Sequence, residues 1–266
     1  MSLPILVVNP NTTKAMTDGL EEALEPILPR PTFFTAPSGI ASINNSDDCH
    51  ASAAAVFPSL LSSSSSDPSQ PSLLSQHSAV LIACYSVHPL VRKLAAAEEL
   101  LQLLGGASSP CRPVLGIFEA SILASLAICL APQDRFGIVT TGAVWEGILS
   151  RGVEDFLGAK ASTEGGKFAG VETTGLTAIE LHSTPQEEVT RRLKEAVKRL
   201  IRRTREKGGE LRAVCLGCAG MVGFDEAVRA GCIEELGDEA GSRVSIVDGV
   251  KAGYVMLEGM VRTGLS

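Results

Sequence analysis

Two cysteines follow short apolar runs of the kind that form buried strands. Cys84 ends the run "AVLIAC", and Cys218 ends "AVCLGC". A thiol whose pKa lies near the working pH can serve as an acid or as a base. Two opposed thiols would therefore remove a proton from one face of a carbon and return one to the other. The pair predicts inversion of a carbon whose proton is acidified by a neighbouring carbonyl, a reaction that needs no metal and no cofactor.

Each of the two thiols is expected just ahead of a helix. After Cys84, Pro89 suits the first turn of a helix, and Ser86 or His88 could cap it. After Cys218 comes "AGMVGFDEAV", whose glycines let backbone amides approach a ligand and act as an oxyanion hole. Free N–H groups and the helix dipole stabilise a thiolate in such a position.

Other chemistry of the same residues stays open. In a redox CxxC pair the first cysteine begins a helix, whereas Cys215 falls inside the predicted strand and is interpreted as a core residue. A structural zinc site needs further ligands at short spacing, which Cys215 and Cys218 lack. Cys84 and His88 could instead form the nucleophile and base of a hydrolase or ring-opening amidase. A non-catalytic binding protein is a third alternative.

Composition limits the class of protein. The chain has 266 residues, 45% of them apolar, and a net charge of -7, which argues against nucleic-acid binding. We expect no secretory signal, and no apolar run reaches the roughly 18 residues that a membrane span needs. The seven cysteines are scattered and odd in number, which fits reduced thiols in a cytoplasmic protein.

Short apolar runs alternate with longer helical patterns, which predicts an α/β fold with mainly parallel sheets flanked by helices. Strands are expected at 4–9, 32–36, 79–84, 113–118, 136–141, 168–174, 213–218 and 244–249. Helices are expected at about 12–27, 89–104, 120–130, 143–157, 184–207, 224–236 and 249–263. The Ser- and Pro-rich segment 58–75 is interpreted as a mobile surface insertion without a part in the chemistry.

A weak internal repeat divides the chain into two halves. The segments beginning "ILVVNPNTT" and "FGIVTTGAV" share a plan of buried strand, polar turn and amphipathic helix, and each leads to a third strand that ends in cysteine. We expect one half at 1–111, with 245–266 packing back on it, and the other at 112–244. Two such halves would deliver one thiol each to a cleft, from the strand ends where ligands bind in α/β sheets.

The ordered motifs "VVNPNTT", "IACYSVHPL", "GIFEAS", "GIVTTG" and "CLGCAGM" cover the whole chain. Together they resemble the Asp/Glu/hydantoin racemase superfamily, and most of all its hydantoin and allantoin racemase-like branch. The resemblance implies two pseudo-symmetric α/β domains with the active site in the cleft between them. It also implies a cofactor-independent two-base mechanism, a small-molecule substrate such as a 5-substituted hydantoin or allantoin, and a homo-oligomer.

By the same resemblance, Cys84 and Cys218 match the catalytic pair. Positions matched to substrate contacts are Asn9, Ser42, Ile43, Tyr85, Ser86, Val87, Phe118, Thr141, Gly142, Ala219 and Gly220. Glu119 is expected to be structural. Many bacterial members read "CFGDP" where this chain has "CYSVHP", which leaves amino-acid racemisation and maleate-type isomerisation open. The matched motifs contain no Arg or Lys, which favours a neutral cyclic amide over a dicarboxylate.

Overall fold

The computed structural model describes residues 3–61, 72–105, 111–158 and 165–265. The chain forms two compact units, Met1–Ile117 with Val250–Ser266, and Phe118–Gly249. Each unit contains one four-stranded parallel sheet flanked by helices, which confirms the predicted α/β fold. Within the described ranges, no helix combines the length and the apolar character needed to cross a bilayer.

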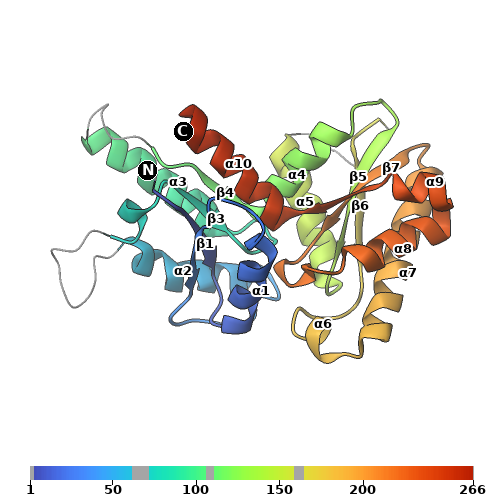
Figure 1. Cartoon of the computed structure of the whole chain (residues 1–266), viewed down its shortest axis with the longest axis horizontal. Helices are drawn as coiled ribbons and strands as arrows, with labels where there is room; N and C mark the ends of the chain where they lie inside the picture. Colours follow the sequence, from blue (N-terminus) through green and yellow to red (C-terminus); the bar gives the residue numbers. More distant parts are fainter. Residues whose placement is uncertain (1–2, 62–71, 106–110, 159–164, 266) are drawn as a thin grey trace. The chain divides into compact units, whose positions relative to one another are not determined.

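The sheet of the first unit has the strand order β2-β1-β3-β4 (Figure 1). Its strands are β1 (Ile5–Asn9), β2 (Thr32–Thr35), β3 (Ala79–Ile82) and β4 (Val114–Gly116), and all neighbours pair in parallel. The helices of this unit are α1 (Lys14–Leu24), α2 (Ser46–Leu61), the short η1 (Leu74–Gln76), α3 (Pro89–Gly105) and α10 (Gly249–Thr263).

Alternate residues of β1 and β3 build the core beneath α2 and α3. One face of this sheet presents Leu6 and Val8 from β1 together with Val80 and Ile82 from β3, all buried. Because successive side chains of a strand point to opposite faces, this set forms one apolar surface. The helices close that surface with Ala53, Val56 and Leu60 from α2 and Leu90 and Leu94 from α3.

The second unit repeats this plan, with the strand order β6-β5-β7-β8 (Figure 1). Its strands are β5 (Asp134–Thr140), β6 (Phe168–Thr173), β7 (Glu210–Leu216) and β8 (Ser245–Asp248). Its helices are α4 (Ile117–Ile128), α5 (Val144–Leu157), α6 (Glu180–Ser183), α7 (Gln186–Glu206), η2 (Ala219–Met221), α8 (Asp225–Leu236) and α9 (Asp238–Ser242). In both sheets the first strand lies between the second and the third, so the weak sequence repeat corresponds to a repeated topology.

The basic run of α7 faces carboxylates of its own unit. Arg199 contacts Glu172 of β6 at 2.7 Å, and Arg202 contacts Glu235 of α8 at 2.7 Å. The opposite side of the helix supplies Leu193, Leu200 and other apolar residues to the core. The run is thus the polar face of an amphipathic helix.

Three expectations need correction. Helix α2 was not predicted, because Pro58 and the following serines obscured its pattern, although Leu60 at its end is buried. The predicted insertion 58–75 is wrong at both ends, since Leu60 and Leu74 lie in the core, while 62–71 fall outside the described residues. The predicted boundaries between the two halves, after residues 111 and 244, each leave out one strand. β4 pairs with β3 and so belongs to the first unit, and β8 pairs with β7 and so belongs to the second.

Candidate functional site

Most of the predicted site residues lie at the C-terminal ends of the first and third strands of each sheet, whereas Ser42 and Ile43 follow β2 and Phe118 follows β4. In the first unit Asn9 is the last residue of β1, and Cys84 lies two residues after the end of β3. In the second unit the segments after β5 and β7 contain Thr141 and Cys218. Parallel α/β sheets bind ligands at this edge. We call the predicted site residues of each unit its half-site, and each half-site contains one predicted catalytic thiol.

The thiol of Cys84 belongs to a cluster of three proton-bearing groups. Its Sγ lies 3.4 Å from Ser86 Oγ, and Cys49 Sγ donates to the same hydroxyl at 3.4 Å. Cys49 also shares a hydrogen bond with Cys84, and this bond is the main reason that the pKa of Cys49 falls to about 7 despite its burial. Hydrogen bonds that favour the charged form lower a thiol pKa in this way. Cys84 itself is half-buried.

Helix α2 brings Cys49 to this cluster. Asn45 precedes the helix, and its Oδ1 accepts a hydrogen bond from the backbone N–H of Asp48 at 2.9 Å. The Asp48 carboxylate in turn accepts from Asn44 N at 2.8 Å, so the first turn is capped from both sides. Ser52 Oγ donates to Pro10 O at 2.5 Å and ties α2 to the segment after β1. Sequence reasoning missed Cys49, although the Asn-x-x-Asp pattern at 45–48 was a recognisable helix start.

The side chain of Asn9 is used to hold the turn after β1. Its Nδ2 donates to Thr13 O at 3.1 Å and to Thr17 Oγ1 at 3.0 Å, while its Oδ1 accepts from Asn11 N at 3.1 Å. Asn9 is almost completely buried. These bonds fix the backbone of the turn, so the structure gives Asn9 a local structural role beside the predicted substrate contact.

Two hydrogen bonds connect the loop before α2 to the turn after β1. Thr12 N donates to Ile40 O at 3.0 Å, and Thr13 Oγ1 donates to Ala41 O at 2.7 Å. The predicted contacts Ser42 and Ile43 follow directly and are half-buried. The loop and the turn after β1 thus form one connected surface in the first unit.

His88 caps helix α3, as one of the two caps expected. Its Nδ1 accepts a hydrogen bond from Leu90 N at 3.3 Å, which requires the tautomer with the proton on Nε2. Burial lowers the pKa of His88 to about 4, so the ring is neutral. Nε2 is buried and has no hydrogen-bond partner among the described residues. A ring whose only basic nitrogen is already an acceptor is poorly suited to be the base of a hydrolase.

The other predicted residues after β3 differ in accessibility. Ser86 is 1% exposed and Tyr85 is 5% exposed, whereas Val87 is 38% exposed. Ser86 is therefore an internal member of the thiol cluster. Val87 is the member of this segment that presents its side chain to solvent.

Cys218 lies in a different setting from Cys84. It precedes the short η2 helix, and its Sγ accepts a hydrogen bond from Gly220 N at 3.3 Å. Burial raises the pKa of Cys218 to about 11, against the opposing effect of that amide. Cys218, Ala219 and Gly220 are all half-buried. At neutral pH the thiol therefore carries its proton, and the amide of Gly220 is directed at sulfur.

The segments after β5 and β7 are in close contact. Thr140 Oγ1 donates to Gly217 O at 2.5 Å, and Gly217 N donates to Val139 O at 2.7 Å. A Cβ atom added at Gly217 would lie 2.6 Å from Thr140 Cβ and 2.8 Å from Val139 O. Only glycine fits between these strands, so Gly217 sets the position of Cys218. Gly142, by contrast, has open space where a Cβ atom would stand.

The remaining predicted residues of the second unit are buried. Thr141 is 4% exposed, and its carbonyl accepts from Gly175 N at 3.1 Å. Phe118 is 1% exposed at the start of α4. Cys215 Sγ lies 3.1 Å from Ser125 Oγ inside the same unit, which agrees with its interpretation as a core residue of the strand.

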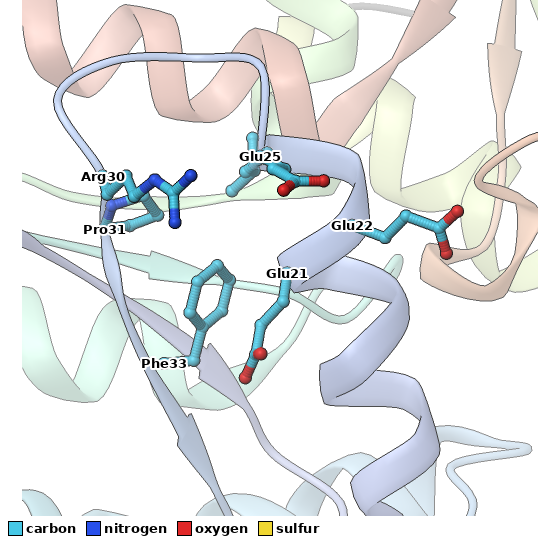
Figure 2. Close-up of a pocket in the computed structure, with 7 residues that line it drawn as sticks. Glu21, Glu22, Glu25, Arg30, Pro31 and Phe33 are labelled. Carbon is cyan, nitrogen blue, oxygen red and sulfur yellow. The ribbon is translucent and has the colours of Figure 1, made fainter.

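A separate hollow in the first unit contains none of the predicted residues. Figure 2 shows this pocket, of about 380 Å³, with Glu21, Glu22 and Glu25 of α1 on one side and Arg30 and Phe33 on the other. Its mixed charges are open to solvent and lie apart from the strand ends. We assign it no role in the chemistry.

Comparisons with known proteins agree with this arrangement. The model of the family described as Asp/Glu/hydantoin racemase matches residues 5–257. An uncharacterized protein of Schizosaccharomyces pombe is 31% identical over 265 residues, which cover 98% of this chain and 93% of the relative. Hydantoin racemase from Pseudomonas sp. strain NS671 is 29% identical over 265 residues, with coverage of 98% and 87%. The crystal structure of allantoin racemase from Pseudomonas fluorescens superposes with a TM-score of 0.69 at 25% identity, covering 99% and 93% of the two chains.

Proposed function

Because this chain belongs to the Asp/Glu/hydantoin racemase family, we propose that it inverts the carbon next to a carbonyl in a small cyclic amide. The homologues named hydantoin racemase and allantoin racemase support a racemase, and hence an isomerase. The proposed substrate is a 5-substituted hydantoin or allantoin, and the proposed catalytic groups are Cys84 and Cys218. We further propose that the enzyme is cytoplasmic and acts as a homo-oligomer.

One observation carries the mechanism. Cys84 and Cys218 follow equivalent strands of two sheets with the same order, yet their surroundings favour opposite protonation states. In the first unit Cys49, which shares a hydrogen bond with Cys84, has its pKa lowered to about 7, whereas in the second unit burial raises the pKa of Cys218 to about 11. Pairs of titratable groups whose surroundings separate their pKa values indicate the division between base and acid. Cys84 is the base of the resting enzyme, and Cys218 is the acid.

The reaction then proceeds in two proton transfers. The Cys84 thiolate takes the proton from the carbon between the amide nitrogen and the carbonyl, and the electron pair moves into the carbonyl as an enolate. The Cys218 thiol donates its proton to the opposite face of that carbon, and the carbonyl re-forms. Product leaves with Cys84 protonated and Cys218 as a thiolate, which the N–H of Gly220 stabilises. The reverse order of transfers converts the other enantiomer.

The residues after the strands favour a substrate without charge. The segments 9–13, 84–88, 140–142 and 217–220 contain hydroxyl, amide, thiol and imidazole groups, but no Lys or Arg to pair with a carboxylate. Two cations approach the end of β6. Arg192 donates to Thr174 O at 3.4 Å and is neutralised by Glu188 at 2.7 Å. Arg199 donates to Thr173 O at 2.8 Å and is neutralised by Glu172 at 2.7 Å. A neutral cyclic amide fits this surface better than a dicarboxylate.

The test is racemisation of single enantiomers of several 5-substituted hydantoins and of allantoin in D₂O. Chiral chromatography measures the loss of enantiomeric excess, and mass spectrometry measures uptake of one deuterium at the stereocentre. We expect racemisation with deuterium uptake by the wild type and none by a Cys84→Ser/Cys218→Ser double variant. Cys111→Ser, which removes a half-buried thiol at the edge of the first unit, serves as the matched control and should remain fully active.

Two results would contradict the proposal. Racemisation by the double serine variant at the wild-type rate would exclude the two-thiol mechanism. Ring opening of the substrate without inversion would favour the amidase alternative instead.

A further inference from the structure

A third thiol stands beside the proposed base. Cys49 is 3% exposed, lies in the first turn of α2, and shares hydrogen bonds with both Ser86 and Cys84. It is 37 residues away from Ser86 in the sequence, so the contact depends on the packing of α2 against the segment after β3. A buried thiol could simply fill space. Here, however, its proton is directed at Ser86 Oγ, the hydroxyl that also lies 3.4 Å from the Cys84 sulfur.

From this geometry we propose that Cys49 is a positioning residue that keeps Cys84 in its thiolate form, by donating to Ser86 Oγ so that the Ser86 hydroxyl proton is directed at the Cys84 sulfur. The inference rests on the proposed function, because it concerns the base of that reaction. Ser86 Oγ lies 3.4 Å from each of the two sulfurs. Once the Cys84 proton leaves, the two protons that remain form a chain from Cys49 through Ser86 to the Cys84 anion, and each hydrogen bond of such a chain strengthens the next.

The negative charge belongs on Cys84 because of the different burial of the two sulfurs. Cys49 is buried on α2, whereas Cys84 is half-buried and nearer to solvent. Charge is disfavoured where water is absent, so the charge of the ionised pair is drawn toward Cys84, although the hydrogen bond between the two thiols also lowers the pKa of Cys49. The pair thus ionises once near neutral pH, and its second proton is retained because two adjacent thiolates would repel one another.

Few other charges act on this cluster. Asp48 and His50 lie on either side of Cys49 in α2; His50 lowers the pKa of Cys49 and Asp48 raises it, both less than the hydrogen bonds do. His88, in the segment after Cys84, is held neutral by burial. The hydrogen bonds are therefore the main influence on the thiol pair, and removal of Cys49 should be visible as a change in titration.

The test follows the alkylation of Cys84 by iodoacetamide between pH 5 and pH 10, read by peptide mass spectrometry. In the wild type we expect the Cys84 midpoint to lie below the ordinary thiol value of about 8.5, because its neighbours can donate hydrogen bonds to the thiolate. In Cys49→Ala the midpoint should rise by at least one pH unit, toward the ordinary thiol value of about 8.5. Cys49→Ser retains a donor and should restore most of the shift. Cys111 provides an internal reference in each sample, since burial and the nearby Glu98 raise its pKa.

Activity provides a second reading on the same variants. In Cys49→Ala, kcat/KM should fall about tenfold at pH 7 and recover to within about threefold at pH 9, where Cys84 ionises without help. A loss of folding would instead lower activity at every pH, and circular dichroism of Cys49→Ala and Cys49→Ser checks for it.

Different results would contradict the role of Cys49 and the proposed racemisation. An unchanged Cys84 midpoint in Cys49→Ala, or a wild-type midpoint near 8.5, would overturn the role of Cys49 even if the enzyme racemises hydantoins. Absence of racemisation by the wild type, together with a Cys84 midpoint below about 8.5 that depends on Cys49, would overturn the proposed reaction and leave the role of Cys49 in place.

Discussion

The two half-sites share a topology but differ in the groups that surround their thiols. At the end of β3, Cys84 is surrounded by the side chains of Ser86 and Cys49, which belong to different elements. At the end of β7, Cys218 receives a single hydrogen bond from the backbone of Gly220, within the same short turn. The repeated fold therefore fixes where the two sulfurs lie along their sheets, while the neighbours of each determine which one holds a proton.

This comparison shows how a duplicated plan can serve an asymmetric task. Racemisation needs a base and an acid at the same time. If the two thiols had the same pKa, part of the enzyme would carry both protons or neither, and those forms would be unproductive. Side-chain donors lower the pKa on one side, and burial raises it on the other. The following predictions break or sharpen this contrast, beginning with the largest effect.

The largest effect is expected from replacing either thiol alone. Cys84→Ser and Cys218→Ser should each reduce racemisation by about 10³-fold, because a serine hydroxyl is a far weaker acid and base than a thiol. The two variants should differ in half-reactions. Cys218→Ser should still exchange the α-proton of one enantiomer in D₂O without inversion, as measured by proton NMR. Equal exchange of both enantiomers by that variant would contradict the assignment of Cys84 as the base.

The pH dependence should show the same asymmetry. Because the base must lose its proton, kcat/KM should rise about tenfold per pH unit while Cys84 is still protonated and level off once it is ionised. Because Cys218 must keep its proton and its pKa is raised to about 11, activity should not decline before about pH 10. Initial rates across a constant-ionic-strength buffer series measure both limbs. A decline of activity beginning near pH 8 would show that the acid of the reaction does not have the raised pKa of Cys218.

The stability of glycine variants tests the close packing of Gly217 against Thr140, which positions Cys218. Gly217→Ala should reduce the free energy of unfolding by about 1–3 kcal/mol, because the added Cβ would lie 2.6 Å from Thr140 Cβ and backbone must move. Gly147→Ala in α5 is the matched control, since its Cβ would meet only Arg151 at an ordinary 3.7 Å. Urea denaturation compares the two. Equal stability would mean that the strands separate easily at Gly217.

The smallest effect is expected at His88. His88→Asn retains an acceptor for Leu90 N, so stability should change by less than about 0.5 kcal/mol, whereas His88→Ala should lose about 1 kcal/mol with the cap. Racemisation by His88→Asn should stay within about threefold of wild type, because the ring takes no part in the two proton transfers. Loss of all activity in His88→Asn would instead favour the hydrolase alternative that pairs this ring with Cys84.

The sequence located most of the elements that carry the half-sites. Runs such as "ILVV" and "AVLI" are apolar and rich in β-branched residues, so they were recognisable as strands buried on both faces. The helix at α3 was predicted from Pro89 to within a residue of its end, because proline and the apolar periodicity indicate the same start. Helix α2 escaped prediction because Ala, Ser and Pro dominate its sequence, and its apolar residues form no clear stripe.

The sequence by itself determined that two thiols follow equivalent strands, since this depends on local periodicity and on the order of residues along the chain. It did not determine the neighbours of those thiols. The contact of Cys49 with Ser86 and Cys84 arises from α2 packing across the sheet, and the proton retained by Cys218 arises from its burial. Both depend on residues distant in sequence, because the pKa of a group is set by the solvent and donors around it in the folded protein.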